Sequence, residues 1–195
     1  MTEVYVVRHG ETDWNKQGRL QGQEDIPLNE KGRAQALACG RALEKTRFQG
    51  IFTSPLSRAR ETAEKIAQFQ ACPVTEEAGL LERDYGVLSG LTLPQREALA
   101  ATGRPDGMEP WESLAQRALL ALNRCADAAG EEGRALLVSH GAWINALLAL
   151  LSGHVIGTGK TVLKNTCVSV LRREGEGWQI LSYNELPEEM GRKPV

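Results

Sequence analysis

Short strand-like runs alternate with helix-length segments along this chain, and this alternation limits its fold more than any other feature. Strand patterns of mostly apolar or β-branched residues are predicted at 4–7, 50–54, 72–77 and 134–140. Helical patterns follow three of them, at about 30–45, about 55–69 and 142–152. Because neighbouring parallel strands must be joined by crossover segments of this kind, the order predicts a largely parallel sheet with helices on both faces.

Capping residues mark where the predicted helices begin. Asn29 precedes the helix expected over 30–45, and Ser54 is expected to cap the next helix, with Pro55 at its first position. Residues 111–129 form a strong amphipathic pattern, and 166–174 with 178–184 flank a glycine-containing turn typical of a hairpin. The hairpin predicts an antiparallel edge.

These elements predict one domain over residues 1–195, a three-layer α/β/α sandwich with a mostly parallel central sheet and an antiparallel edge. Residues 91–111 contain three prolines and are expected to be an irregular excursion with one short helix. The polar tail 186–195 is expected to be flexible. Nothing in the sequence indicates the oligomeric state.

Composition excludes several classes of partner. The net charge of −2 gives no reason to expect nucleic acid or an anionic membrane surface as a partner. The longest apolar run, 142–151, is about half the length that spans a bilayer. Four dispersed cysteines without a CxxC pair favour reduced thiols. Together these observations predict a cytoplasmic protein.

Reactive side chains follow three of the predicted strands. Arg8 and His9 end the first, Arg58 lies just inside the helix after the second, and His140 follows the strand at 134–139. Because ligands bind beyond the carboxyl ends of strands in open α/β sheets, we expect these four side chains to share one site.

The residue types favour a phosphate ligand. Arginine presents a fork of donors that matches phosphate oxygens, and helix N-termini add backbone N–H groups. Gly10 and Gly141 are expected to allow close backbone approach, and Asn15 and Gln21 can donate further hydrogen bonds. A neutral imidazole is a good nucleophile toward a phosphate whose charge the arginines offset. The predicted partner is therefore a small-molecule phosphate ester.

Five segments, in this order, resemble the histidine phosphatase superfamily, the phosphoglycerate mutase-like proteins. The resemblance spans roughly residues 4–152, and the segments read "VVRHGETDWN", "LQGQEDIPLNEKGRAQA", "TSPLSRARETAE", "LLERDYGVLSG" and "LLVSHGAWIN". The resemblance implies the fold of that family and phosphoryl transfer through a phosphohistidine, without a metal or an organic cofactor.

Roles follow from the resemblance, residue by residue. His9 matches the phosphorylated nucleophile, and Glu82 in "LLERDYG" matches the general acid–base. The residues implied to hold the phosphoryl group are Arg8, Asn15, Arg58 and His140, with Gln21 lining the pocket.

Each of these residues also has a simpler interpretation. Taken alone, Arg58 is an ordinary helix residue or an ion-pair partner of Glu61 or Glu64. Spacing alone does not separate Glu82 from its acidic neighbours Glu76, Glu77 and Asp84. His154 has no motif around it and is interpreted as structural or exposed.

Two other site types are disfavoured. "GTGKT" (157–161) lacks the spacing of a P-loop, which needs a glycine where His154 stands. A zinc site formed by His9 and His140 is disfavoured because arginines in the same pocket would repel a cation.

The segment expected to form the substrate lid, 91–111, is short and contains only two cations, Arg96 and Arg104. A mutase needs a second anion site and a closing lid, so the sequence favours a phosphomonoesterase acting on a small phosphorylated metabolite. A cofactor-dependent phosphoglycerate mutase is the first alternative, and a non-catalytic phospholigand-binding module is the second. Met108, Pro110 and Trp111 suggest an open mouth suited to a leaving group of some apolar character.

Overall fold

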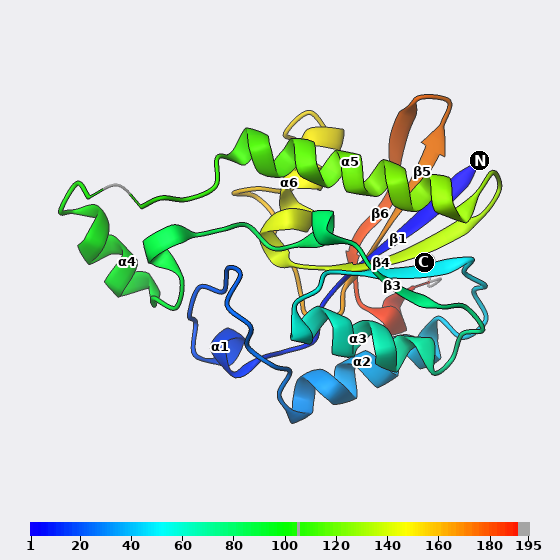
Figure 1. Ribbon diagram of the computed structural model, residues 1–195, viewed down its shortest axis with the longest axis horizontal. Helices are drawn as coiled ribbons and strands as arrows, with labels where there is room; N and C mark the ends of the chain where they lie inside the picture. The colour runs from blue at the N-terminus through cyan, green and yellow to red at the C-terminus, as the bar shows by residue number, and fades with distance from the viewer. Residues whose placement is uncertain (105, 191–195) are drawn as a thin grey trace.

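The protein is built on one six-stranded mixed sheet, shown in Figure 1 as a computed structural model that describes residues 1–104 and 106–190. The strand order is β3-β2-β4-β1-β5-β6. The strands are β1 (Thr2–Arg8), β2 (Gly50–Thr53), β3 (Val74–Glu76), β4 (Arg134–Ser139), β5 (Val168–Glu174) and β6 (Gly177–Glu185). Strands β1 to β4 are parallel to one another, and β5 pairs antiparallel with both β1 and β6. The predicted fold class, including the antiparallel edge, is confirmed.

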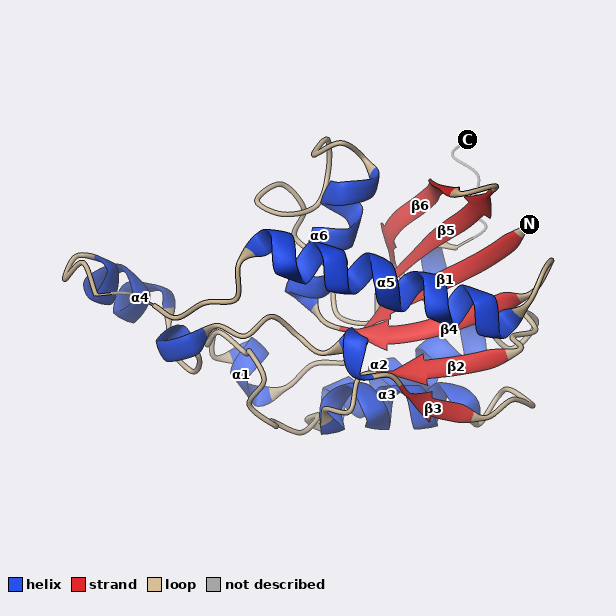
Figure 2. Ribbon diagram, turned by 45° about the horizontal axis from the view of Figure 1, so that its top comes forward, coloured by secondary structure: helices blue, strands red, loops and turns tan. Residues whose placement is uncertain are grey.

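Helices cover both faces of the sheet, so the molecule has three layers (Figure 2). One face packs against α5 (Trp111–Ala129) and α6 (Gly141–Leu151), and the other against α2 (Glu30–Ala42) and α3 (Ser57–Ala67). Strand β1 contributes side chains to the hydrophobic cores on both faces of the sheet, because successive side chains of a strand point to opposite faces. Val4 and Val6 pack with α5 and α6, whereas Val7 packs with α2 and α3. This two-sided burial is why the strands read as continuous apolar runs.

The parallel strands place their carboxyl ends at the same edge of the sheet. Arg8 lies beside Ser139 in the β1–β4 register, and Thr53 lies beside Val138 in the β2–β4 register. The residues that follow these strands, His9, Ser54 and His140, are therefore brought together, although they are far apart in the chain.

Beyond that edge the chain forms an extended arm, which we define as residues 84–104 and 106–110. It contains the 3₁₀ turn η2 (Gly86–Leu88) and the helix α4 (Leu93–Ala100), which lies at the far left of the molecule in Figure 1. The short helix α1 (Asp13–Lys16) and the turn η1 (Ala78–Leu80) lie between the arm and the sheet. The single short helix predicted within 91–111 corresponds to α4. No residue of α4 is buried, in contrast to the helices on the sheet.

One local prediction differs from the structure. The helix expected to begin at Pro55, after a cap at Ser54, begins at Ser57, because the Ser54 hydroxyl bonds to His140 and to the Leu56 N–H. The tail 186–195, which the sequence predicts to be flexible, includes the turn η3 (Pro187–Glu189), with Pro187 buried and Met190 against the α2–α3 core. Residues 191–195 of that prediction lie outside the described residues.

Within the described part of the chain, no helix combines the length and the apolar character needed to cross a bilayer.

Candidate functional site

His9 lies at the carboxyl end of β1 with its ring orientation set by the backbone. Its Nδ1 is 2.6 Å from the carbonyl oxygen of Gly10. Because a carbonyl can only accept, Nδ1 carries the hydrogen and Nε2 keeps the lone pair of the neutral ring. The side chain is only 2% exposed. The ring is thus held as a neutral base or nucleophile that acts through Nε2.

Gly10 allows the loop after β1 to pass close to α2. A Cβ at Gly10 would lie 2.4 Å from the carbonyl oxygen of Gly32, so no other residue fits without a shift of the backbone. At Gly141 a Cβ would meet the Arg8 Nε at an ordinary 3.6 Å, which places this glycine beside the guanidinium. Close approach of either glycine to a phosphate stays a prediction.

Arg58 is a buried cation and Arg8 a half-buried one, and neither has a counterion in contact among residues 1–104 and 106–190. Arg58 donates to the carbonyls of Gly22 and Glu24, both at 2.7 Å. Arg8 donates through Nη1 to the carbonyl of Leu163. The Nε atom of each guanidinium is buried without a hydrogen-bond partner in that part of the chain. Removing the donors of unpaired cations from water is costly, so the arrangement is that of an anion site.

The simpler interpretation of Arg58 as an ion-pair partner of its own helix is wrong. Glu61 pairs with Arg33 and Lys65, and Glu64 lies near Arg60.

His140 faces the same site from the end of β4. Its ring centroid lies 5.2 Å from that of His9. Its Nε2 is 2.8 Å from the Ser54 hydroxyl, and its Nδ1 is buried without a partner among the described residues. Two histidines and two arginines predicted from separate segments are therefore brought together.

Glu82 projects its carboxylate onto the N-terminus of α6. Its Oε1 accepts from the backbone N–H groups of Arg83 (2.8 Å) and Trp143 (3.0 Å), and its Oε2 accepts from Ala142 (3.1 Å). Oε2 accepts only this one donor and is therefore the oxygen better placed to carry a proton. The acidic neighbours are engaged elsewhere: Glu76 and Glu77 pair with the surface residues Arg60 and Arg124.

Carboxylates accept some of the N–H groups at two helix N-termini. Glu82 accepts those of Ala142 and Trp143 at the start of α6, and the Asp25 carboxylate accepts the Ser57 N–H at the start of α3, at 2.7 Å. The positive ends of the two helices therefore face carboxylates, and the arginines supply the hydrogen bonds available to an anion.

Asn15 and Gln21 each present an amide whose oxygen is already used. Oδ1 of Asn15 accepts from the Thr12 N–H at 3.1 Å, and Oε1 of Gln21 lies 2.8 Å from the Thr12 hydroxyl. Thr12 is completely buried. Since the oxygen ends are engaged, the NH₂ ends remain to donate to a ligand.

Three supporting residues escape the sequence analysis. Thr12 orients two amides, Ser54 holds His140, and Asn165 donates to the carbonyl of His9 (3.1 Å) and to Oδ1 of Asn15 (3.3 Å). The "ET" that follows "RHG" is a possible signal for Thr12. Asn165 lies about 150 residues from its partners and has no motif around it, so only the fold reveals it.

Electrostatics favour a neutral imidazole beside a protonated acid. Burial lowers the pKa of His9, and the nearby Arg58 and Arg8 lower it further. The pKa of His140 is lowered by burial and by Arg58. Burial raises the pKa of Glu82, against the opposing effect of its backbone donors and Arg58. Groups whose environments move their pKa values in these directions can act as nucleophile and general acid.

Metal-ligating side chains do not gather around these residues. In the chain described here, residues 1–104 and 106–190, no group of three or more His, Cys, Asp or Glu side chains is placed to hold an ion.

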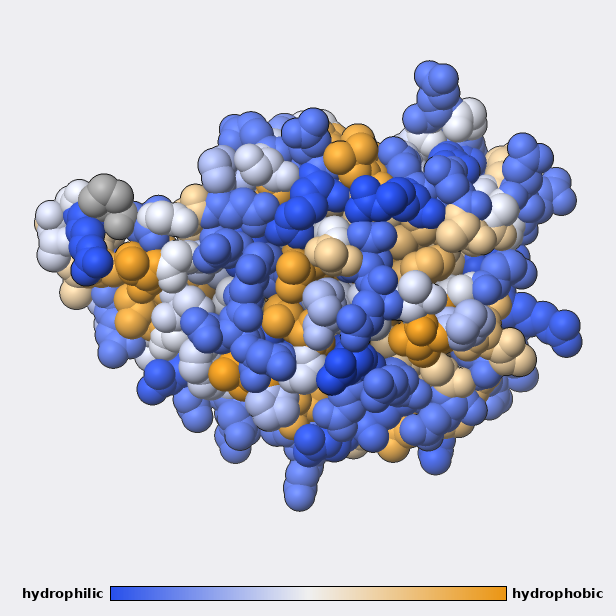
Figure 3. Space-filling model, in the orientation of Figure 1, coloured by the Kyte–Doolittle hydropathy of each residue, from blue (hydrophilic) through white to orange (hydrophobic). Residues whose placement is uncertain are grey.

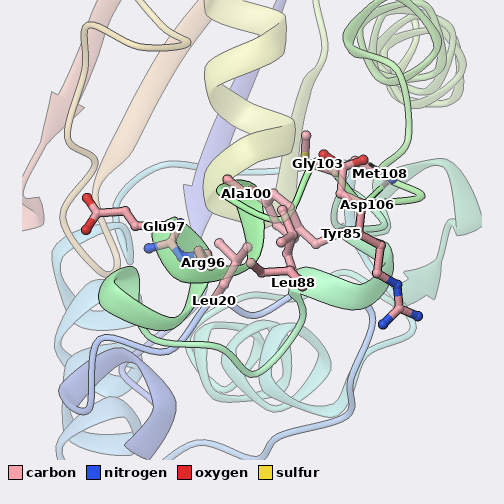
Figure 4. A pocket seen from close by; sticks show the side chains of 11 residues that line it. Leu20, Tyr85, Leu88, Arg96, Glu97, Ala100, Gly103, Asp106 and Met108 are labelled. Carbon is pink, nitrogen blue, oxygen red and sulfur yellow. Dashed lines mark hydrogen bonds between the residues drawn. The ribbon is translucent and has the colours of Figure 1, made fainter.

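A cavity of about 590 Å³ opens between η2 and α4, on the arm side of the site (Figure 4). Tyr85 forms part of its wall and stands three residues after Glu82. Leu20, which precedes Gln21, forms another part. The cavity thus adjoins the segments that carry the acid and one of the pocket amides.

Comparison with known proteins places this site in a family. Residues 4–186 match the model of the histidine phosphatase superfamily (branch 1). The chain is 40% identical over 184 residues to the uncharacterized phosphatase PhoE of Bacillus subtilis (strain 168), covering 94% of this chain and 95% of that protein. It is 34% identical to the probable phosphoglycerate mutase GpmB of Salmonella choleraesuis (strain SC-B67), covering 91% and 88%.

A solved structure agrees with these relatives. The mycobacterial glucosyl-3-phosphoglycerate phosphatase in complex with VO3 superimposes with a TM-score of 0.84 at 29% identity, covering 94% of this chain and 98% of the other. The strand-end histidines, the two arginines beside them and these full-length matches agree: the chain belongs to branch 1 of the histidine phosphatase superfamily.

Proposed function

We propose that the protein is a phosphomonoesterase that hydrolyses a small phosphorylated metabolite through a phosphohistidine on His9. The observation that carries the proposal is the pair Arg8 and Arg58, whose buried Nε atoms have no partner among the described residues, beside an imidazole whose Nδ1 is held by a carbonyl so that Nε2 keeps the lone pair. A phosphoryl group is the ligand that satisfies both, because it accepts hydrogen bonds from arginine and is attacked by imidazole.

In the first step Nε2 of His9 attacks phosphorus in line with the leaving oxygen. The P–N bond forms, the P–O bond to the alcohol breaks, and the proton on Glu82 Oε2 passes to the leaving oxygen. The Gly10 carbonyl stabilises the ring as positive charge develops, because it accepts the Nδ1 hydrogen.

In the second step the ionised Glu82 takes a proton from water, and the water oxygen attacks phosphorus. The P–N bond breaks, the lone pair returns to Nε2, and inorganic phosphate leaves. The backbone N–H groups of Ala142 and Trp143 favour the ionised carboxylate that this step needs as a base.

The remaining predicted residues hold the transferring group. Arg8 and Arg58 offset its negative charge, and the NH₂ groups of Asn15 and Gln21 donate to its oxygens. The Ser54 hydroxyl donates to Nε2 of His140, which leaves the Nδ1 hydrogen of that ring for a phosphoryl oxygen. We propose no metal or organic cofactor for these steps, since arginines supply the positive charge.

The second candidate is a phosphoglycerate mutase, favoured by the similarity to GpmB. A mutase must keep water from the phosphohistidine while its intermediate reorients. Because the arm has no buried residue in α4 and leaves an open cavity, we favour hydrolysis.

Trapping the intermediate tests the proposal. Turnover of a ³²P-labelled ester, quenched in base, should leave label on the protein that acid then releases, as expected of a phosphoramidate. His9→Ala should carry no label, whereas His154→Ala, a change of the remaining histidine, should carry as much as the wild type. Acid-stable label, or label retained by His9→Ala, would place the nucleophile elsewhere.

A further inference from the structure

The cavity beside the arm has an apolar lining. Its apolar wall is formed by Leu20, Tyr85, Leu88, Leu99, Ala100 and Met108. Figure 4 shows Leu20, Leu88, Ala100 and Tyr85 facing a common space. Figure 3 shows apolar surface at the end of the molecule that carries α4. At about 590 Å³ the cavity falls in the size range of small-molecule pockets.

Its position fits the leaving group of the proposed reaction. The acid must lie on the leaving-group side of phosphorus, because Glu82 protonates the alcohol oxygen. Tyr85 follows Glu82 by three residues, and its ring lies against Gly22, whose carbonyl accepts from Arg58 at 2.7 Å. An alcohol that leaves past Glu82 therefore enters the cavity at Tyr85.

The charges of the residues that line the cavity sum to zero. Two cations, Arg96 and Arg104, are matched by two carboxylates, Glu97 and Asp106. Glu97 points away from the apolar residues in Figure 4. The Nε of Arg96 is buried without a partner among the described residues, which leaves one donor for an oxygen of the alcohol. Because these four charges around the rim of the cavity sum to zero, they give little attraction to a second phosphate or carboxylate.

We infer that the cavity binds the alcohol part of the substrate, and that the preferred substrates are monoesters of uncharged alcohols with an apolar body. This inference rests on the proposed phosphatase function and names its substrate class. It also gives a physical reason to disfavour a doubly phosphorylated three-carbon acid, for which the rim supplies no net positive charge.

A series of n-alkyl phosphates tests the inference, because their leaving groups differ in length and hardly in basicity. We expect kcat/KM to rise by up to about fourfold for each added methylene until the cavity is full. Ala100→Trp should fill the cavity and flatten the series, with methyl phosphate affected by no more than about twofold. Ala98→Trp is the matched control, since Ala98 is on the same helix and does not line the cavity.

Binding of n-alkylphosphonates, which cannot be hydrolysed, gives a readout independent of turnover. Their Kd should fall with chain length in the wild type and in Ala98→Trp, and should be independent of length in Ala100→Trp. A flat wild-type series, a slope that survives in Ala100→Trp, or flattening by both variants would overturn the inference. Length-dependent binding without any ester turnover would instead overturn the proposed function and leave the pocket standing.

Discussion

Two regions of this protein are built in opposite ways. One is the proposed phosphate end, which we define as His9, Arg58, Glu82 and His140, and the other is the arm. At the phosphate end the reactive groups are buried, with Arg58 and His140 fully inaccessible and Glu82 only 5% exposed. Most of them are held by main-chain atoms, such as the Gly10 carbonyl at His9 and the α6 N–H groups at Glu82. On the arm, α4 has no buried residue and its cavity is lined largely by side chains.

This difference in construction suggests that one region carries out the reaction and the other selects the substrate. Main-chain donors and acceptors at strand ends cannot be altered by substitution of their own side chains, so the geometry of phosphoryl transfer is tied to the sheet. Side chains on an exposed helix change at little cost to stability. We therefore expect substitutions at the phosphate end to abolish turnover of every ester, and substitutions on the arm to change which ester is preferred.

The largest effect is expected from Glu82→Gln, which removes the proton donor. On an alkyl phosphate the loss in kcat should be on the order of 10²–10⁴-fold, since an alkoxide leaves poorly without a proton. On p-nitrophenyl phosphate, whose leaving group needs no acid, the loss should be far smaller. Equal losses on both substrates would identify another acid, with Asp84 the next candidate.

Arg58→Gln should lower kcat/KM by about 10²–10³-fold on esters of any size, because a buried donor to the transferring group is lost. Vanadate is expected to raise the Tm of the wild type and to leave that of Arg58→Gln unchanged. Arg104→Gln, an exposed arginine of the arm, is the matched control and should change turnover of methyl phosphate by less than about twofold. A similar loss of turnover in both variants would contradict the proposal that one region carries out the reaction and the other selects the ester.

The pH profile of kcat/KM should be bell-shaped, with one limb set by His9 and the other by Glu82. Neutral His9 persists below its ordinary value of 6.5, because burial and the arginines lower its pKa. Protonated Glu82 persists above its ordinary value of 4.5, because burial raises its pKa. The profile of kcat/KM should thus fall in acid as His9 protonates and fall in base as Glu82 ionises.

Glu82→Gln serves as the control for that profile, since ionisation of the substrate is common to both proteins. The variant should lose the alkaline limb that Glu82 causes and keep the acid limb. An unchanged alkaline limb would remove Glu82 from the role of acid.

The smallest effect is expected from Asn165→Ala, which touches no substrate atom. Loss of its hydrogen bonds to the His9 carbonyl and to Asn15 should lower kcat about threefold to tenfold, with KM for methyl phosphate less affected. Asn165→Asp should not rescue activity, because a carboxylate cannot donate. Lys164→Ala, an exposed neighbour, should retain wild-type kinetics; a loss there would indicate a general effect on the loop.

Local pattern alone determined the layered sheet and which strand-end residues meet at its edge. Alternating strand and helix signals predict crossovers, and parallel crossovers put the ends of β1, β2 and β4 at one edge, as observed. "RHG" and "SHG" at two such ends were therefore enough to predict that His9 and His140 lie close together. Their rings are 5.2 Å apart.

Tertiary packing decided what local pattern left open. Four acidic residues lie close together in the chain: Glu76, Glu77, Glu82 and Asp84. Of these four, only Glu82 reaches the N-terminus of α6. The cavity likewise depends on how α4 lies over η2, which no residue spacing encodes. These outcomes depend on contacts between segments 60 or more residues apart in the chain, set by the packing of whole elements. A period of two or of 3.6 residues carries no information about such contacts, because it describes only which face a side chain takes.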